Sequence, residues 1–190
     1  MIRREQFTII EGDQGKMQTR IMIISDIHGG LYNLEKVLAV YEAEHFDRLF
    51  VLGDLFGYSY DETEDRILER INGIKDCVMV KGNCDPQTLR CEDVRRLTIE
   101  GVKITLSHGH RFGLFSLLRE DADIICLGHT HRPSISVGSK RITLNPGSVS
   151  KSRSGPNSFA TIEGGYIYLK SIDNEVLEKV EMPEIGGKKD

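Results

Sequence analysis

Side chains that can bind metals follow apolar runs in this chain. The run IMII leads into Ser25 and Asp26, and His28 comes two residues further on. Residues two apart at the end of a strand point to the same side, and a carboxylate oxygen beside an imidazole nitrogen suits a borderline divalent metal. A single Asp-x-His pair, taken alone, is better explained by ordinary turn chemistry.

The same arrangement occurs four more times. Further apolar runs end at Asp54, Asn83, His108 and the pair His129 and His131. In open α/β sheets, binding sites form outside the carboxyl ends of the strands. We therefore expect the five strand ends to converge on one crevice that holds metal-ligating side chains.

Length and charge limit the class of protein. A chain of 190 residues is most simply one domain, 1–190, which buries about 70% of its unfolded surface. Lys and Arg total 25 against 29 Asp and Glu, so the net charge is -4 and a dedicated nucleic-acid surface is not expected. A small anionic substrate is compatible with this charge, because a bound metal supplies local positive charge.

The sequence also indicates a cellular compartment. No run approaches the 18 or so apolar residues of a transmembrane helix, and charges stand where a signal peptide has its apolar region. The four cysteines, Cys77, Cys84, Cys91 and Cys126, fit no C-x-x-C zinc pattern. Their arrangement favours a reducing compartment. We expect a cytoplasmic protein with no membrane partner.

Apolar spacing predicts the elements that position these side chains. In the first half, strands at 21–24, 47–53 and 77–82 alternate with two helices, whose apolar faces carry Leu34 to Tyr41 and Ile67 to Ile71. Strand, helix and strand in succession predict parallel pairing. The second half predicts a hairpin across Glu100 and Gly101, a short helix around Leu114, and strands at 123–128, 141–144, 158–162 and 166–172. This order predicts two facing sheets flanked by helices, with a core at about 20–172, a dispensable extension at 1–19 and a polar tail at 181–190.

Six short blocks resemble a known family. The blocks SDIHG, LGDL, GNCD, SHGH, LGHTH and NPGS occur in this order between about residues 20 and 172. Together they resemble the motif set of the calcineurin-like metallophosphoesterase superfamily, and in particular its small YfcE-type phosphodiesterase branch. The resemblance implies an α/β fold, a four-layer sandwich of two mixed sheets flanked by helices, with a two-metal site at the strand ends.

The resemblance also implies which residues bind the metals. Asp26, His28 and His131 would hold one ion, Asn83, His108 and His129 the other, and Asp54 would bridge the two. Nitrogen and oxygen donors favour Mn, Fe, Zn or Ni over a soft metal, and we expect two divalent ions, with Mn²⁺ favoured. His45, the one histidine outside the blocks, is expected on the polar side of a helix.

The expected reaction is direct hydrolysis of a small phosphodiester. Two metals about 3.5 to 4 Å apart generate hydroxide near neutral pH, and no covalent intermediate is needed. Asp54 and Asn83 are expected to take part through the metals. His110 is either a proton donor or a cap of its turn. Many relatives carry histidine at the position of Cys84, which here is better explained as packing than as a nucleophile, and Asp85 is expected to orient its neighbours.

Three other functions stay open at this stage. A phosphomonoesterase or a dinucleotide polyphosphate hydrolase would use the same metals. The retromer subunit of the same fold acts as a protein-binding scaffold, but its ligand set is incomplete, whereas all seven positions are filled here. The sequence is compatible with a homo-oligomer and does not identify the substrate.

Overall fold

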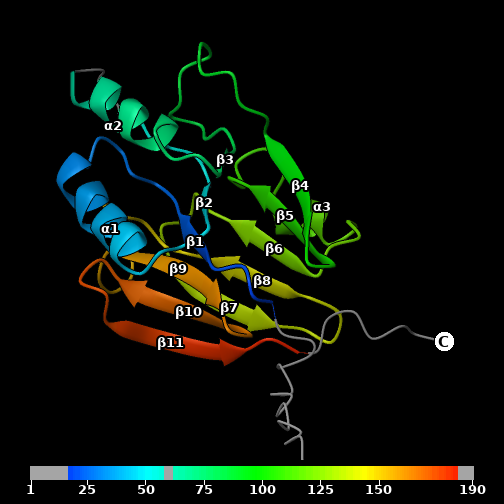
Figure 1. The fold of residues 1–190 in the computed structure, drawn as a ribbon. Coiled ribbons are helices and arrows are strands. Elements are labelled where there is room, and N and C mark those ends of the chain that lie inside the picture. The colour runs from blue at the N-terminus through cyan, green and yellow to red at the C-terminus, as the bar shows by residue number, and fades with distance from the viewer. Residues whose placement is uncertain (1–16, 58–61, 184–190) are drawn as a thin grey trace, which may run out of the picture.

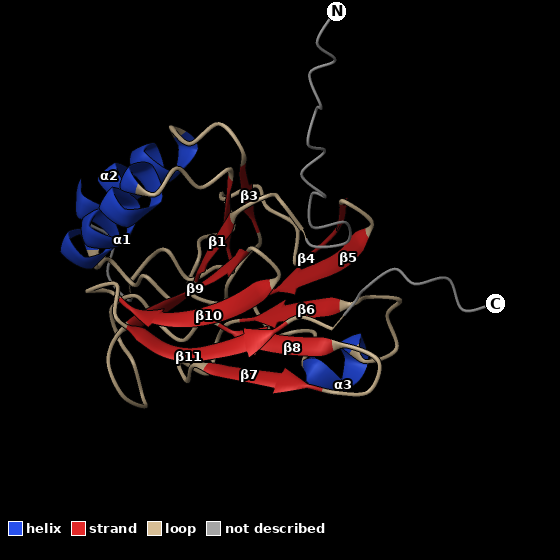
Figure 2. Ribbon diagram, turned by 60° about the horizontal axis from the view of Figure 1, so that its bottom comes forward, coloured by secondary structure: helices blue, strands red, loops and turns tan. Residues whose placement is uncertain are grey.

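The computed structural model describes residues 17–57 and 62–183, which form two β-sheets packed face to face (Figure 1). The first sheet has six strands in the order β11-β10-β9-β1-β2-β3, and the second has five in the order β4-β5-β6-β8-β7. Helices α1 (Leu31–Ala43) and α2 (Glu62–Asn72) lie together on one side of the molecule, and the single-turn helix α3 (Leu114–Leu117) lies on the other (Figures 1 and 2). The expected four-layer sandwich is therefore confirmed, although its fourth layer is only one helical turn.

The six-stranded sheet combines a parallel half with an antiparallel half. Strands β1 (Ile21–Ile24), β2 (Arg48–Val51) and β3 (Cys77–Met79) are parallel. Strands β9 (Ser158–Glu163), β10 (Tyr166–Ser171) and β11 (Val176–Glu181) continue the sheet with antiparallel pairing. The parallel half agrees with the strand-helix-strand order, because a helix must carry the chain back across the sheet between parallel strands.

The five-stranded sheet is also mixed. Strands β4 (Val94–Ile99) and β5 (Val102–Ser107) form the expected hairpin, and Glu100 and Gly101 both adopt positive φ, as a two-residue hairpin turn requires. Strands β6 (Ile124–Leu127) and β8 (Ile142–Asn145) are parallel to β5, and β7 (Ser134–Val137) pairs antiparallel with β8. Strands β5 and β6 thus deliver their carboxyl ends to the same edge.

Alternation along the strands divides the core into layers. Ile21 and Ile23 of β1 face the second sheet and pack with residues such as Ile104 and Ile124. Met22 and Ile24 face the opposite way, toward the apolar sides of α1 and α2. A strand buried on both faces reads as a continuous apolar run, which explains why IMII shows no alternation of apolar and polar residues.

Four expectations need correction or restriction. The structure adds β7 and β11, which the sequence did not predict. His45 is exposed, but it lies two residues beyond the end of α1, with φ 55°, and not on the helix. Met17 is buried in the core between the sheets, so the expected extension at 1–19 is packed against the fold at this residue, whereas its part at 1–16 lies outside the described residues. Strand β11 reaches the first residue of the expected tail, of which 184–190 also lies outside the described residues.

A further expectation concerned membranes. Among the helices of the described ranges, none has the length and apolarity needed to cross a bilayer.

Candidate metal centre

Loops that follow five strands bring the seven metal-ligand candidates to one edge of the sandwich. Asp26 and His28 follow β1, Asp54 follows β2, Asn83 follows β3, His108 follows β5, and His129 and His131 follow β6. Strands β1 to β3 belong to one sheet, and β5 and β6 belong to the other. The candidates therefore lie where the open ends of both sheets meet, as the positions of the strand ends predicted.

Five of these residues have left-handed backbone, which is uncommon for residues other than glycine. The five are Asp26 (φ 55°), His28 (46°), Asp54 (55°), His129 (67°) and His131 (57°). Each such conformation costs about 1 to 3 kcal/mol and persists only where the surroundings enforce it, and such residues concentrate at functional sites. At these five residues the chain gives up some folding stability, and the strained backbone holds the side chains in a fixed direction.

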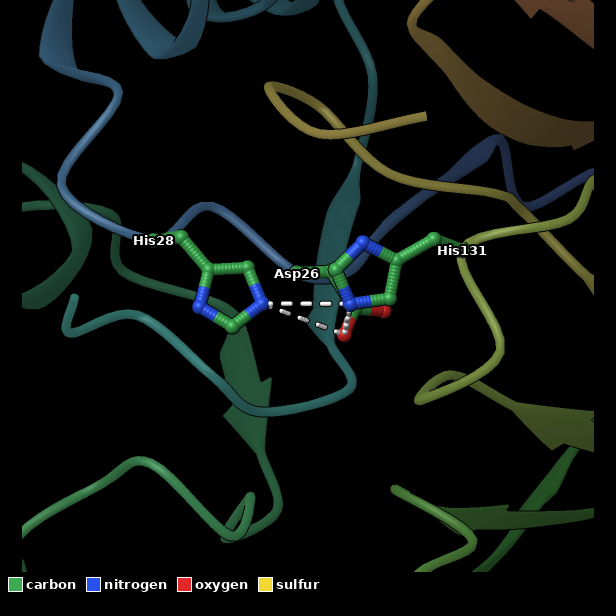
Figure 3. Close-up of side chains that lie close together, drawn as sticks. All are labelled: Asp26, His28 and His131. Carbon is green, nitrogen blue, oxygen red and sulfur yellow. Dashed lines mark hydrogen bonds and ion pairs between the residues drawn. The ribbon is translucent and has the colours of Figure 1, made fainter. Parts of the chain in front are cut away.

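Asp26, His28 and His131 form the first cluster, in which the two rings direct their Nε2 atoms toward each other above the carboxylate (Figure 3). The Nε2 atoms are 3.2 Å apart. Asp26 Oδ1 lies 3.2 Å from Nε2 of His131 and 3.7 Å from Nε2 of His28. This oxygen is buried, and no hydrogen-bond donor reaches it among the described residues. An unsatisfied carboxylate oxygen between two ring nitrogens fits a cation.

The outer nitrogens of these two rings fix their tautomers. Nδ1 of His131 lies 2.7 Å from the carbonyl oxygen of Lys151, and Nδ1 of His28 lies 3.2 Å from that of Phe56. A carbonyl oxygen only accepts, so each Nδ1 carries the proton and donates it. In the neutral ring, Nε2 then presents a lone pair to the interior, which is the arrangement of a metal-binding histidine. Two lone pairs facing each other at 3.2 Å fit the divalent ion that the resemblance implies.

Asp54 is the centre of the second cluster and also contacts the first. Its Oδ2 lies 3.3 Å from Nε2 of His108 and 3.6 Å from Nε2 of His28. Nδ1 of His108 donates to the carbonyl oxygen of Leu52 at 2.7 Å, so its Nε2 is also directed inward, 3.1 Å from Oδ1 of Asn83. Asp54 is therefore placed to contact ligand atoms of both clusters, as a bridging carboxylate must.

The carboxylates of both clusters are stabilised in the charged form. Burial alone would raise the pKa of Asp26, but contacts with His131, His28 and Ser25 together hold it well below its usual range. Burial likewise opposes ionisation of Asp54, while the contact with His108 lowers its pKa overall. The same contact raises the pKa of His108 against the effect of burial. Two buried anions close together create a strongly negative site that attracts cations.

Two more histidines, His129 and His110, lie beside His108 at the edge of the site. The His129 ring centroid is 5.1 Å from that of His108, and its backbone N–H donates to Asp26 Oδ2 at 3.0 Å. The His110 ring centroid lies 5.3 Å from that of His108 and 6.3 Å from that of His129. Nδ1 of His110 is buried, and no partner for it occurs in the described part of the chain. Burial and the neighbouring His108 lower the pKa values of both His110 and His129, which favours their neutral forms.

Cys84 lies closer to this site than the sequence indicated. Its sulfur, a ring nitrogen of His28 and a carboxylate oxygen of Asp54 all lie within 4.8 Å of one another. Burial, and then the charge of Asp54, raise the pKa of the Cys84 thiol to about 12. A thiol is a good nucleophile only as the thiolate, so the protonated form argues against covalent catalysis by Cys84.

Two residues that bind no metal in the expected set hold the loops together. The Asp85 carboxylate accepts hydrogen bonds from the backbone N–H groups of Gly82 (2.7 Å), Asp54 (2.9 Å) and Leu55 (2.8 Å), and so joins the loops after β2 and β3. The Ser148 hydroxyl donates to the carbonyl oxygen of Asp26 at 2.7 Å. The contacts of Asp85 agree with the expectation that it orients its neighbours, and the contact of Ser148 shows that the NPGS turn supports the loop after β1. The sequence did not predict that Asp85 would contact backbone N–H groups rather than side chains.

The class of protein follows from the fold and the site together. Metallophosphoesterases are two-sheet sandwiches whose strand ends carry carboxylates, an asparagine and histidines, as found here. The chain belongs to the calcineurin-like phosphoesterase superfamily, because the model of that domain matches residues 19–164. The family acts on phosphoesters with divalent metal ions, and the described cluster supplies a candidate site for them.

Individual relatives agree with this assignment. Phosphodiesterase YfcE of Escherichia coli is 27% identical over 172 residues, which cover 82% of this chain and 94% of the relative. The solved structure of that phosphoesterase has a TM-score of 0.77 and 26% identity, covering 86% of this chain and all of the other. The probable metallophosphoesterase YsnB of Bacillus subtilis is 34% identical over 137 residues, or 68% of this chain and 74% of the relative. The protein is thus a phosphoester hydrolase with phosphodiesterase relatives.

The fold alone is shared more widely. The structure of Vps29 from Entamoeba histolytica in complex with zinc has a TM-score of 0.65 at 22% identity and covers 86% of this chain. At this identity the similarity concerns the architecture, and function follows from the residues of the site.

Proposed function

We propose that the protein hydrolyses small phosphodiesters with two divalent metal ions held by the seven residues of this site. Asp26, His28 and His131 are assigned to one ion, Asn83, His108 and His129 to the other, and Asp54 to both. The observation that carries the proposal is the position of Asp54 Oδ2, 3.6 Å from Nε2 of His28 and 3.3 Å from Nε2 of His108. One carboxylate between two histidine clusters is the arrangement that a dinuclear centre needs.

When bound, the two ions supply a hydroxide near neutral pH and neutralise charge on the phosphate oxygens. The residues of the chain have the complementary tasks. Carbonyl oxygens of Leu52, Phe56 and Lys151 keep three imidazoles in the tautomer that presents Nε2 to the interior. Asn83 contributes an uncharged oxygen, which leaves the site less negative toward an anionic substrate than a third carboxylate would.

His110 is assigned to proton transfer. Its buried Nδ1 has no hydrogen-bond partner among the described residues, and its ring lies beside those of His108 and His129. A nitrogen that caps its own turn would be bonded to backbone, so this geometry supports a role in proton transfer over the capping role. Positioned groups that transfer protons contribute about 10² to 10⁴ in rate.

Manganese is the proposed ion, because imidazole nitrogen with carboxylate and amide oxygen suits Mn²⁺, Fe²⁺, Zn²⁺ or Ni²⁺. The substrate is proposed to be a small phosphoester, and self-association is compatible with this site.

All four cysteines are free, which supports a reducing environment such as the cytoplasm. A scaffold function is not favoured, since relatives that match most of this chain are named as phosphodiesterase or metallophosphoesterase.

The test is reconstitution of metal-stripped protein. After chelation and dialysis, hydrolysis of bis(4-nitrophenyl) phosphate should fall to the background rate, and added Mn²⁺ should restore it with a stoichiometry of about two ions per chain. A parallel assay with 4-nitrophenyl phosphate separates diesterase from monoesterase activity. Full activity after stripping would exclude the metal mechanism, and inactivity with Mn²⁺, Fe²⁺, Zn²⁺ and Ni²⁺ would favour the scaffold function.

A further inference from the structure

A cavity of about 280 Å³ lies against the outer face of the five-stranded sheet, next to the metal-ligand candidates. Leu127 of β6 and Thr143 of β8 line its floor, and Gly113 and Leu114 at the start of α3 line one wall. Leu127 packs with the small apolar cluster under α3 rather than with the core between the sheets. The cavity is therefore separate from the main core, on the side of the molecule where Figure 2 draws α3.

The lining of this cavity is uncharged. Apart from His129, its side chains are leucines, hydroxyl residues and Asn145, with no carboxylate, lysine or arginine among them. The Asn145 amide already donates to the carbonyl oxygen of Gly128 (2.9 Å) and to Thr130 Oγ1 (3.0 Å). Thr130 Oγ1 also accepts from the N–H of Arg132, which leaves its own proton to donate to another group. These features suit a neutral group with apolar faces and a hydrogen-bond acceptor at its edge.

His129 joins this cavity to the metal centre. It is one of the residues that line the cavity, and its ring centroid lies 5.1 Å from that of His108, whose Nε2 is 3.3 Å from Asp54. Through His129 the cavity adjoins the centre, so a group esterified to a phosphate bound there would lie close to it. Whole-ligand pockets measure about 300 to 1,000 Å³, so the volume here suits one ring system rather than a complete ligand.

We propose that this cavity is a subsite for an uncharged aromatic ring esterified to the substrate phosphate, an inference that rests on the phosphodiesterase function proposed above. Leu114 and Leu127 contact the faces of the ring, and the hydroxyls of Thr130, Ser134 and Thr143 contact its edge. The preferred substrates are aryl or nucleoside esters rather than esters of short alkyl alcohols.

Calorimetry with the Mn²⁺-loaded protein tests this subsite through two inert probes, phenylphosphonate and methylphosphonate. The probes share the charged group and differ only in the ring, whose burial should give phenylphosphonate about tenfold higher affinity. Thr143→Phe fills the cavity from the floor and should remove this preference while leaving the affinity for methylphosphonate unchanged. Thr143→Val, which keeps the shape and removes only the hydroxyl, is the matched control and should retain most of the preference.

A second variant fills the same space from the opposite wall. Gly113 has extended backbone (φ -70°, ψ 170°), and a Cβ there would meet only Gly109 O, at 3.8 Å, so Gly113→Leu should fold even if Thr143→Phe does not. Equal affinity of the wild type for both probes, with bis(4-nitrophenyl) phosphate still hydrolysed, would overturn the subsite alone. A preference that survives in the folded, filled variants would also overturn it. Absence of both hydrolysis and phosphonate binding would overturn the proposed function together with the subsite.

Discussion

Asp85 holds Asp54 in position through the backbone of Asp54. Its Oδ2 accepts the N–H of Asp54 at 2.9 Å, and its Oδ1 accepts the N–H of the next residue at 2.8 Å. Oδ2 also accepts the N–H of Gly82 at 2.7 Å, so one buried carboxylate joins the ends of two neighbouring strands. Burial raises the pKa of Asp85 although these N–H groups lower it.

Asp85→Asn should therefore weaken both the fold and the metal centre. The amide nitrogen cannot accept, so at least one buried N–H loses its partner, at a cost of about 1 to 3 kcal/mol in the free energy of unfolding. Affinity for Mn²⁺ should fall about 10- to 100-fold, the usual range for residues that orient metal ligands. Urea unfolding and metal titration measure the two effects. Asp121→Asn, at an exposed position, is the control, and equal behaviour of the two variants would refute the role of Asp85.

Gly82→Ala should displace Asp54 directly. A Cβ at Gly82 would lie 2.0 Å from Asp54 Oδ1 and 2.2 Å from the backbone nitrogen of Asp54, and the backbone cannot move without breaking the loop after β2. We expect a loss of about 1 to 3 kcal/mol in stability and a fall in kcat at saturating Mn²⁺. Gly73→Ala, whose Cβ would meet nothing closer than 3.4 Å, should leave kcat unchanged. Normal kcat in Gly82→Ala would show that the position of Asp54 is less constrained than the contacts indicate.

Asp54→Asn should lower kcat/KM for bis(4-nitrophenyl) phosphate at least about 100-fold, at the upper end of effects seen for residues that only orient ligands. The amide keeps the shape of the carboxylate but carries no charge to share between two cations. Metal content by elemental analysis should fall in parallel, and thermal unfolding would show whether the variant is folded. Near-normal turnover would mean that another residue bridges the ions.

Substitutions of Cys84 should change the choice of leaving group. The thiol stays protonated beside Asp54 and His28, and its pKa of about 12 makes it a poor acid for an alkoxide. Cys84→His should raise kcat/KM for an alkyl ester by about tenfold or more and change an aryl ester much less, since a positioned acid contributes about 10² to 10⁴ where the leaving group is poor.

Cys84→Ala is the matched variant for this comparison. It should leave both esters within about threefold of wild type, because a protonated thiol supplies little catalysis. Loss of activity on both esters in Cys84→Ala would show that the sulfur itself takes part in the reaction.

The sequence predicted the sandwich and the convergence of the strand ends because both follow from buried, parallel strands. Strands β7 and β11 escaped prediction for the opposite reason. These strands lie at the edges of the sheets and are largely exposed. SISV alternates over only four residues and VLEKVE does not alternate strictly, so neither has a clear strand pattern. Their pairing depends on the neighbouring strand rather than on local propensity.

Within the site, the types of the residues were predictable and their backbone was not. Left-handed conformation is usually signalled by glycine or asparagine, but here aspartate and histidine adopt it at Asp26, His28 and Asp54. The contacts of Asp85 with backbone N–H groups likewise depend on how two loops pack, which the motif does not reveal. His45 was misplaced for the same reason, since nothing in its type marks the left-handed residue after α1.

The left-handed aspartates and histidines of this chain also set stability against the proposed function. Glycine would relieve the unfavourable backbone at an exposed position such as His129 and would stabilise the metal-free fold, yet it would remove an imidazole from the site. A descendant of this chain that no longer needed the proposed metal site should therefore accumulate glycine or asparagine at these positions. Histidine and aspartate should persist there, against their own conformational preference, only where the proposed site is still under selection.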